Sequence, residues 1–276
     1  MKFCSAEHVS DQELLDVLNA AFSDYLIPMR HTDRSLAQMF RQRSFCRSST
    51  IVAKAEGRLV SFWFIGRRDT QAFLVASGTR PEWRRRGLNE QIAQRVISGL
   101  KGQGASVLRL EVFRDNQAAV ALYEKIGFVV KRKLDLYEIP PGTMEPLPGV
   151  DTASWSDVSE MLQAHRDWQP SWLYENESLS AIQDDLDCHC IRSQGQIVGS
   201  AAVIRSSNTL AQIAVRPSAR RRGMARRLIA HAASKAPKTA MRIINVDASD
   251  AAFKTLLTAC GARENKGQFE MALPLG

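Results

Sequence analysis

The sequence has few cysteines, few aromatic residues and no long apolar run. Five of its 276 residues are cysteines, and aromatic residues make up 7%. No apolar stretch approaches the roughly 20 residues that span a membrane, and the first residues lack the basic and apolar segments of a secretion signal. These absences argue against membrane insertion, and we expect a cytoplasmic protein that makes no membrane contact.

The cysteines also lack the paired spacing that binds zinc. Cys188 and Cys190 flank His189, which is too tight for the usual ligand arrangement, and the other three cysteines lie far apart in the sequence. No cysteine stands in a recognisable nucleophile context. The residues therefore predict no metal site and no covalent intermediate.

Charge is unevenly distributed along the chain. Residues 1–142 contain 22 lysines and arginines against 15 aspartates and glutamates, whereas residues 143–276 contain 15 against 14. A basic first half favours a polyanionic ligand, an acidic acceptor or nucleic acid, although a solvated basic surface explains the same count. The charge distribution alone does not distinguish these ligands from a solvated basic surface.

A repeated segment divides the sequence into two copies. Pro81–Gly87 (PEWRRRG) recurs as Pro217–Gly223 (PSARRRG), with five of seven residues identical at an offset of 136. Ala55–Val60 parallels Ser193–Val198 at an offset of 138. A nearly constant offset indicates two copies of one domain.

A proline-rich segment lies between the copies. Residues 139–150 contain four prolines and two glycines, which argue against a helix or a central strand. We therefore expect a linker there, an N-terminal domain at residues 1–140 and a C-terminal domain at residues 141–276.

Each copy shows the same succession of patterns. Ser10 and Glu13 have the spacing of a capping box that opens a helix, and Gly87 precedes a helix whose apolar residues recur on one face. Strands are expected at residues 49–55, 59–65, 72–79, 107–113 and 128–139, and a further helix at residues 117–126. This order predicts a mixed α/β fold class, a mostly antiparallel sheet with flanking helices, in two tandem domains.

The two arginine–glycine segments each follow a predicted strand and open a predicted helix. A helix N-terminus presents unpaired N–H groups to anions, glycine lets the backbone approach closely, and arginines add charged hydrogen bonds. An ordinary basic helix start is the alternative. The predicted phosphate-binding residues are Arg84, Arg85, Arg86, Gly87, Leu88 and Asn89 in the first copy and Arg220, Arg221, Arg222, Gly223, Met224 and Ala225 in the second.

These segments resemble the pyrophosphate loop of GNAT acetyltransferases, Gln/Arg-x-x-Gly-x-Gly/Ala, and the whole chain resembles bacterial tandem GNAT proteins. The resemblance implies acetyl-CoA as cosubstrate and an acceptor amine on a small molecule or a peptide. The second copy fits the pattern with Ala225 at the last position. The first copy has Asn89 there, whose larger side chain either crowds the phosphate or adds a hydrogen bond.

The segment from Asn116 to Phe128 resembles a second GNAT signature, Asn-x-x-Ala-x-x-x-Tyr-x-x-x-Gly-Phe. The resemblance implies that Asn116 contacts the pantetheine arm of the cosubstrate and that Tyr123 protonates the leaving thiolate. From the residues alone, Asn116 is also suited to capping its helix. Tyr123 shares a helix face with apolar residues, which also suits a core position.

Glu111 is the candidate base, because an attacking amine must lose a proton. It precedes Tyr123 by twelve residues, which resembles ribosomal-protein N-terminal acetyltransferases of the family. Strand alternation places Glu111 on the same face as Arg109, so a structural ion pair is the alternative. The strand that ends near Thr79 is expected to bind the cosubstrate and to offer backbone N–H groups to the oxyanion.

The second copy lacks these candidate catalytic and binding residues. It has Asn245, Asp250 and Leu257 at the positions of the predicted base, the asparagine and the tyrosine. Leucine cannot donate a proton, so we expect the first copy to carry catalysis and the second to be structural or cofactor-binding. By the resemblance to tandem GNAT proteins, Asp24 and Tyr25 are weaker candidates for the acceptor site.

Three other functions are compatible with part of the sequence. A non-catalytic CoA-binding or regulatory protein would keep the loops without the chemistry. A nucleic-acid-binding module would use the basic first half, but no aromatic-rich basic strand pattern accompanies it, so nucleic acid is not an expected partner. Aminoacyl-tRNA-dependent transfer would not be expected to keep two phosphate loops. The sequence leaves the acceptor, the acyl group and the oligomeric state open.

Overall fold

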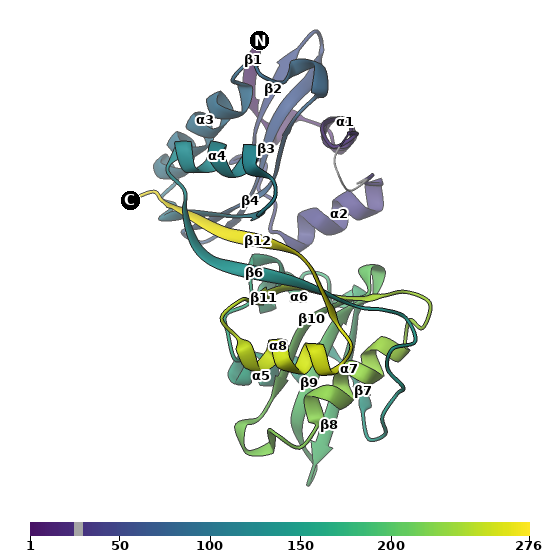
Figure 1. Cartoon of the computed structure of the whole chain (residues 1–276). Helices are drawn as coiled ribbons and strands as arrows, with labels where there is room; N and C mark the ends of the chain where they lie inside the picture. The colour runs from purple at the N-terminus through teal and green to yellow at the C-terminus, as the bar shows by residue number, and fades with distance from the viewer. Residues whose placement is uncertain (25–29) are drawn as a thin grey trace. The chain divides into compact units, whose positions relative to one another are not determined.

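The computed structural model describes residues 1–24 and 30–276 and divides the chain into two compact units (Figure 1). The first unit contains Met1–Val112, Asn116–Lys131 and Glu270–Gly276, and the second contains Phe113–Asp115 and Arg132–Phe269. Each unit therefore includes a segment from the other half of the sequence. The predicted domain boundary between residues 140 and 141 divides the two sequence copies, and it stays a prediction.

The first unit is a sheet covered on both faces. Phe62, Trp63 and Phe64 are consecutive and all fully buried, and their strand is contacted by two helices, α1 (Asp11–Ala21) and α3 (Leu88–Gly102). Its strands are β1 (Lys2–Ser5), β2 (Ile51–Ala55), β3 (Arg58–Arg68), β4 (Gln71–Thr79) and β5 (Val107–Phe113), and its helices are α1 (Asp11–Ala21), α2 (Asp33–Gln42), α3 (Leu88–Gly102) and α4 (Gln117–Ile126). Strands β1 to β4 pair antiparallel in succession, whereas β4 and β5 are parallel.

The second unit repeats this arrangement. Its strands are β6 (Val129–Ile139), β7 (Asp151–Ala153), β8 (Leu186–Ser193), β9 (Gln196–Ile204), β10 (Thr209–Val215), β11 (Met241–Asp247) and β12 (Arg263–Pro274), and its helices are α5 (Trp155–His165), α6 (Asn176–Ser180), α7 (Met224–Ser234) and α8 (Ala251–Ala259). Strands β7 to β10 pair antiparallel, β10 and β11 are parallel, and β6 joins β11 antiparallel. Both β6 and β12 begin in one unit and end in the other.

Short 3-10 helices connect several of these elements. They are η1 (Ala6–His8), η2 (Pro81–Trp83), η3 (Trp172–Tyr174), η4 (Gln183–Asp185), η5 (Arg205–Ser207) and η6 (Pro217–Ala219). The proline at the first position of η2 and η6 favours this start, because its fixed φ suits a helical turn. The two helices occupy equivalent places, each between the end of a strand and an arginine–glycine segment.

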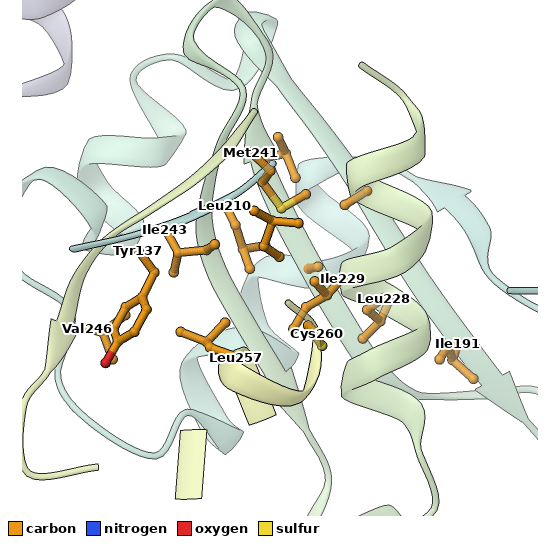
Figure 2. Packing of buried hydrophobic residues seen from close by; sticks show 14 residues of the cluster. Tyr137, Ile191, Leu210, Leu228, Ile229, Met241, Ile243, Val246, Leu257 and Cys260 are labelled. Carbon is orange, nitrogen blue, oxygen red and sulfur yellow. The ribbon is translucent and has the colours of Figure 1, made fainter. Parts of the chain in front are cut away.

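The core of the second unit lies on both faces of its sheet. Along β9, Ala201 and Val203 belong to one buried cluster, and the alternate residues Ala202 and Ile204 belong to another. Figure 2 shows the first of these clusters, in which Leu228 and Ile229 of α7 and Leu257 of α8 pack against the sheet. The period of two in the strand thus supplies a core to each layer of helices.

Local sequence signals predicted these elements well. Ser10 and Glu13 form the expected capping box at the start of α1, in which each side chain accepts from the other residue's backbone N–H. The predicted helix at residues 117–126 and the predicted strand at residues 107–113 have the same bounds in the structure. Residues 140–150 form neither helix nor strand, as the prolines predicted. The mixed α/β fold class with two similar domains is confirmed.

None of the helices within residues 1–24 and 30–276 has both the length and the apolar character that a membrane span requires.

Candidate active site

The two arginine–glycine loops have nearly the same backbone. Arg85 and Arg221 both adopt a positive φ, of 58° and 61°. Gly87 and Gly223 follow as the N-caps of α3 and α7, with φ of 70° and 75°. Left-handed conformations are costly for residues with a side chain, and glycine removes that cost at the cap. The repeated sequence therefore encodes a repeated turn.

Each loop leaves room and hydrogen-bond donors for an anion. A Cβ added at Gly223 would meet no atom within 4 Å, and one added at Gly87 would meet only the Gln91 amide nitrogen at 3.9 Å. The first intrahelical bond of α3 runs from Gln91 N to Gly87 O, at 3.1 Å. The N–H groups before it have no acceptor within the helix. Both loops therefore fit a phosphate group.

The three arginines of the first loop do different things. Arg84 braces the loop, since its guanidinium bonds to Asp24 at 2.7 Å and to the carbonyl of Thr79 at 3.2 Å. Arg86 donates to the Glu82 carbonyl at 3.0 Å and lies over the neighbouring tryptophan ring. Arg85 is exposed and has no hydrogen bond or ion pair with any described residue. Arg85 is therefore the arginine most available to an anion.

The second loop is braced in the same way. Arg220 donates to the Val215 carbonyl at 2.9 Å and to the His165 carbonyl at 3.1 Å, and it pairs with Asp167 at 2.9 Å. Arg221 and Arg222 are exposed. The first arginine of each loop thus holds the loop to the preceding strand and to the end of the unit's first long helix.

Asp24 lies at the first loop. Hydrogen bonds from the Arg84 guanidinium hold the pKa of the Asp24 carboxyl below its ordinary value. The same contact gives Asp24 a structural role as the partner of Arg84, and its predicted role in the acceptor site stays a prediction. Tyr25, the other acceptor-site candidate, lies outside the described residues.

Tyr123 is both a packed aromatic and a positioned hydroxyl. Its side chain is 7% exposed, and its ring makes edge contacts with Trp63 and Phe128. Its hydroxyl lies 3.0 Å from the Ser77 Oγ on β4. Ser77 was not predicted from the sequence. The only signal is weak: β4 ends in the polar segment Ser-Gly-Thr after an apolar stretch, which suits residues that do not pack in the core. The structure therefore links α4 to β4 through this pair.

This link lies beyond the point where β4 and β5 stop pairing. The parallel pairing covers three residue pairs, from Gln71–Val107 to Phe73–Arg109, although β4 continues to Thr79. Glu111 is half-buried on β5, two residues past the last pair, and burial alternates along β5 as the sequence predicted. Ser77 and Glu111 thus lie beyond the last residues through which β4 and β5 pair with each other.

Two other predicted residues of the first unit, Asn116 and Thr79, have structural contacts. Asn116 is the N-cap of α4, and its side chain accepts from Ala119 N at 3.2 Å. Thr79 is 8% exposed, and its hydroxyl lies 2.8 Å from the Ser61 Oγ. The predicted contacts of Asn116 and Thr79 with the cosubstrate stay predictions, since a cap and a strand end leave backbone groups available.

In the second unit, the position equivalent to Tyr123 carries no proton donor. Leu257 is fully buried in the core cluster of Figure 2. Asn245 is 3% exposed and donates to the Ser171 Oγ at 2.8 Å. Asp250 caps α8 by accepting from Phe253 N at 2.9 Å, just as Asn116 caps α4. The alignment of the two copies is thus supported by the capping contacts.

A cleft of about 770 Å³ opens beside the second loop. Its lining includes Arg221, Gly223, Met224 and Ala225 of the predicted phosphate site, together with Phe253 of α8. Ligand pockets in proteins commonly span about 300–1,000 Å³. The second unit therefore has a site of ligand size without a proton donor at the tyrosine position.

The side chains of Cys188, His189 and Cys190 alternate between the two faces of β8. Cys188 and Cys190 belong to the core cluster around α5, and burial raises the pKa of the Cys188 thiol to about 12. The ring of His189 instead lies 4.9 Å from that of His231. Over residues 1–24 and 30–276, no group of three or more histidine, cysteine and acidic side chains is arranged to hold a metal ion.

Two family models match this chain. The acetyltransferase (GNAT) family model matches residues 13–128, and an acetyltransferase (GNAT) domain model matches residues 161–256. The chain belongs to the GNAT superfamily. Because the two GNAT models match successive regions, the tandem arrangement predicted from the repeated loops is confirmed.

Curated relatives share part of this GNAT chain. Mycothiol acetyltransferase of Streptomyces coelicolor is 30% identical over 121 residues, which cover 43% of the chain and 39% of that protein. The [ribosomal protein bS18]-alanine N-acetyltransferase of Salmonella typhimurium is 35% identical over 74 residues, which cover 27% of the chain and 50% of that protein. The matches thus span half or less of each relative's length.

Solved GNAT structures resemble nearly the whole chain. A tandem GNAT protein from the clavulanic acid biosynthesis pathway has a TM-score of 0.74 at 12% identity, covering 100% of this chain and 98% of that one. A GCN5-related N-acetyltransferase from Sphaerobacter thermophilus has a TM-score of 0.71 at 15% identity, covering 95% and 92%. At these identities the likeness shows the fold.

Proposed function

We propose that this GNAT protein transfers an acetyl group from acetyl-CoA directly to an amine, and that the first unit carries the chemistry. The observation that carries the proposal is the Tyr123 hydroxyl held 3.0 Å from the Ser77 Oγ, beyond the last paired residues of β4 and β5. The second unit has Leu257 at the tyrosine position. A proton donor to a leaving thiolate is therefore present in one unit of the two.

The residues of the first unit have distinct roles in this proposal. Gly87, the N–H groups that follow it and Arg85 hold the pyrophosphate of acetyl-CoA, and the backbone near Thr79 polarises the thioester carbonyl. Glu111 takes the proton of the attacking amine, directly or through water. Tyr123 then gives its proton to the thiolate that leaves. Each proton transfer by a positioned side chain typically accelerates such a reaction by about 100- to 10,000-fold.

The acceptor is proposed as a class, an uncharged amine of a small molecule or a peptide. The relatives' names include both kinds, since one acts in mycothiol acetylation and the other on an alanine of a ribosomal protein. The basic excess of residues 1–142 favours an acceptor that carries negative charge elsewhere.

A non-catalytic CoA-binding protein is the second candidate. The cleft of about 770 Å³ beside the second loop supports it, because this unit keeps a ligand-sized site although leucine stands at the tyrosine position. Such a protein would bind acetyl-CoA and leave it intact.

A screen of acceptors distinguishes the two candidates. Thiol release from acetyl-CoA is followed with small amines, amino sugars and alanine-initiated peptides, each tested with and without the protein. Amine-dependent release, with the acetylated amine identified by mass, is the expected result. Binding of acetyl-CoA by calorimetry without thiol release for any amine would instead establish the non-catalytic function.

A further inference from the structure

A cavity of about 270 Å³ lies in the second unit between the end of α7 and the proline-rich linker, and we call it the linker pocket. Its lining includes Ile139 and Met241, which pair across β6 and β11 and are both buried. The full lining consists of residues 139–146, Ala233, Ser234, Pro237, Thr239 and Met241. None of these residues lines the cleft of about 770 Å³ beside the second loop, so the two sites are separate.

Hydrogen bonds hold the linker in place over this pocket. The Arg227 side chain of α7 donates from Nε to the Pro148 carbonyl at 3.0 Å and from Nη2 to the Gly149 carbonyl at 3.2 Å. Closer to the pocket, the backbone N–H and the hydroxyl of Thr143 donate to the Pro140 carbonyl, at 3.3 Å and 2.7 Å. Walls that are fixed before a ligand arrives reduce the ordering cost of binding.

The end of α7 forms one wall of the linker pocket and favours positive charge. Pro237 follows Ala233 by four residues and has no N–H, so the Ala233 carbonyl cannot accept the usual intrahelical bond. No described residue donates a hydrogen bond to the backbone carbonyl of Ala233 or of Ser234. Unpaired carbonyls at a helix C-terminus carry partial negative charge, which stabilises a nearby cation.

The linker adds a carboxylate to the same pocket. Glu145 is exposed and makes no hydrogen bond or ion pair with any described residue. Among the described residues that line the pocket, Glu145 alone is charged. The two lysines near the end of α7, Lys235 and Lys238, are not among the lining residues. An anion in this pocket would therefore meet the carboxylate and the negative end of α7.

The other polar groups of the lining mostly accept hydrogen bonds. The Thr143 hydroxyl donates to the Pro140 carbonyl and the Ser234 hydroxyl donates to the His231 carbonyl, both at 2.7 Å. These hydroxyls therefore offer a ligand their lone pairs. Four of the lining residues are prolines, which supply apolar rings and have no N–H. A ligand that suits this lining has a hydrogen-bond donor at one end and an apolar body.

We propose that the linker pocket binds a small primary alkylammonium ion, with its charged group at Glu145 and the end of α7. An ammonium group has three donors and no acceptor, which complements carbonyl and carboxylate oxygens. Its alkyl group packs against the proline rings and against Ile139 and Met241. The inference concerns the second unit and is independent of acetyl transfer by the first.

Saturation-transfer NMR with cyclohexylammonium as the probe tests the linker pocket. Cyclohexanol and cyclohexanecarboxylate have a similar shape but lack the positive charge. At neutral pH we expect cyclohexylammonium to bind with a millimolar dissociation constant, which is within reach of a ligand of this size. We expect cyclohexanol to bind about tenfold more weakly and cyclohexanecarboxylate to show no detectable binding.

Three variants locate the binding. Glu145→Gln keeps the shape of the side chain, removes its charge and should weaken cyclohexylammonium binding about fivefold, as expected for an exposed ion pair. Glu160→Gln removes another exposed carboxylate, on α5, and is the matched control with unchanged binding. Ala233→Leu fills the pocket from α7 and should abolish detectable binding. Circular dichroism and thermal melting establish that each variant is folded.

Two outcomes would overturn the proposal. One is wild-type affinity for cyclohexylammonium in Glu145→Gln and in folded Ala233→Leu, which would place the amine elsewhere on the protein. The other is equal affinity for cyclohexanol and cyclohexylammonium, which would remove the role of charge. Because these measurements follow binding and not thiol release, they are separate from a failure of the proposed acetyltransferase activity.

Discussion

At the scale of single residues, Tyr123 unites two environments that the sequence presents as alternatives. Its ring packs against Trp63 and Phe128 as a core aromatic does, and its hydroxyl meets Ser77 at 3.0 Å. Helical periodicity predicted that the ring packs in the core, and the family signature predicted a role for the hydroxyl. Ser77 could not be predicted, because this bond joins residues 46 positions apart and no spacing rule connects them.

Ser77 should act as a positioning residue for the tyrosine. We expect Ser77→Ala to lower kcat about tenfold and to change the KM for acetyl-CoA little, because one lost hydrogen bond leaves the phenol proton less well directed. Ser77→Thr keeps the hydroxyl and should restore most of kcat. Steady-state kinetics of thiol release measure both, and a Ser77→Ala protein with wild-type kcat would remove Ser77 from the mechanism.

His189 should make the second unit sensitive to acid. Burial lowers the pKa of His189 to about 4, and the His231 ring and the Lys235 ammonium add to this effect while Asp187 opposes it. Because the folded pKa is below the unfolded value of about 6.5, the unfolded chain takes up the proton first as pH falls. Stability is therefore fully present above about pH 6.5 and declines toward pH 4.

Urea unfolding at several pH values measures this decline. We expect a loss on the order of 2 kcal/mol between pH 7.5 and pH 5 from this residue. His189→Gln cannot titrate and should show a correspondingly smaller loss over the same range. The same pH dependence in both proteins would assign the acid sensitivity to other groups.

At the scale of elements, local signals and long-range contacts were predictable to different degrees. The capping box at Ser10 and the bounds of α4 depend on neighbouring residues, so sequence patterns contain them. The loops at Gly87 and Gly223 were likewise recognisable from glycine, arginine and a following helix. What the pattern could not show is that Arg84 turns back to Asp24, since that contact spans 60 residues.

The arginines of the first loop should therefore differ in their effects. Arg84→Ala should raise the KM for acetyl-CoA and also lower the free energy of unfolding by about 1 kcal/mol, because it removes bonds that brace the loop. Arg85→Ala should raise the KM several-fold and change stability by less than about 0.5 kcal/mol, as expected of an exposed side chain.

Kinetics and urea unfolding of the two variants make the comparison. Lys101→Ala, which removes an exposed positive charge at the far end of α3, is the matched control and should alter neither KM nor stability appreciably. An unchanged KM in Arg85→Ala, or equal losses of stability in both loop variants, would contradict the division of roles between Arg84 and Arg85.

At the scale of the whole molecule, the duplication is easier to predict than which segments belong to each compact unit. A constant offset between repeated motifs revealed two copies, and the family models confirm them. The segments 132–140 and 270–276, however, each belong to the compact unit of the other copy. Strand pairing between distant segments leaves no periodic signal in the sequence, because the same alternating pattern suits either sheet.

The two units also differ in chemistry where they agree in backbone. The loops match in their dihedral angles, whereas Ser77 and Tyr123 of the first unit correspond to Ile213 and Leu257 of the second. Under the proposed function, the turn that both units share serves binding, and the loss of the tyrosine hydroxyl removes catalysis from the second unit. The central claim is therefore that turnover belongs to the first unit.

Single-turnover thiol release from acetyl-CoA, with a saturating acceptor amine, tests this claim most directly in Tyr123→Phe and in Arg221→Ala. Phenylalanine keeps the packed ring and removes the acid, while the second change lies in the exposed loop of the other unit. The account predicts a loss of about 100-fold or more in the rate for Tyr123→Phe and a wild-type rate for Arg221→Ala. An undiminished rate in Tyr123→Phe, or a comparable loss in Arg221→Ala, would contradict it.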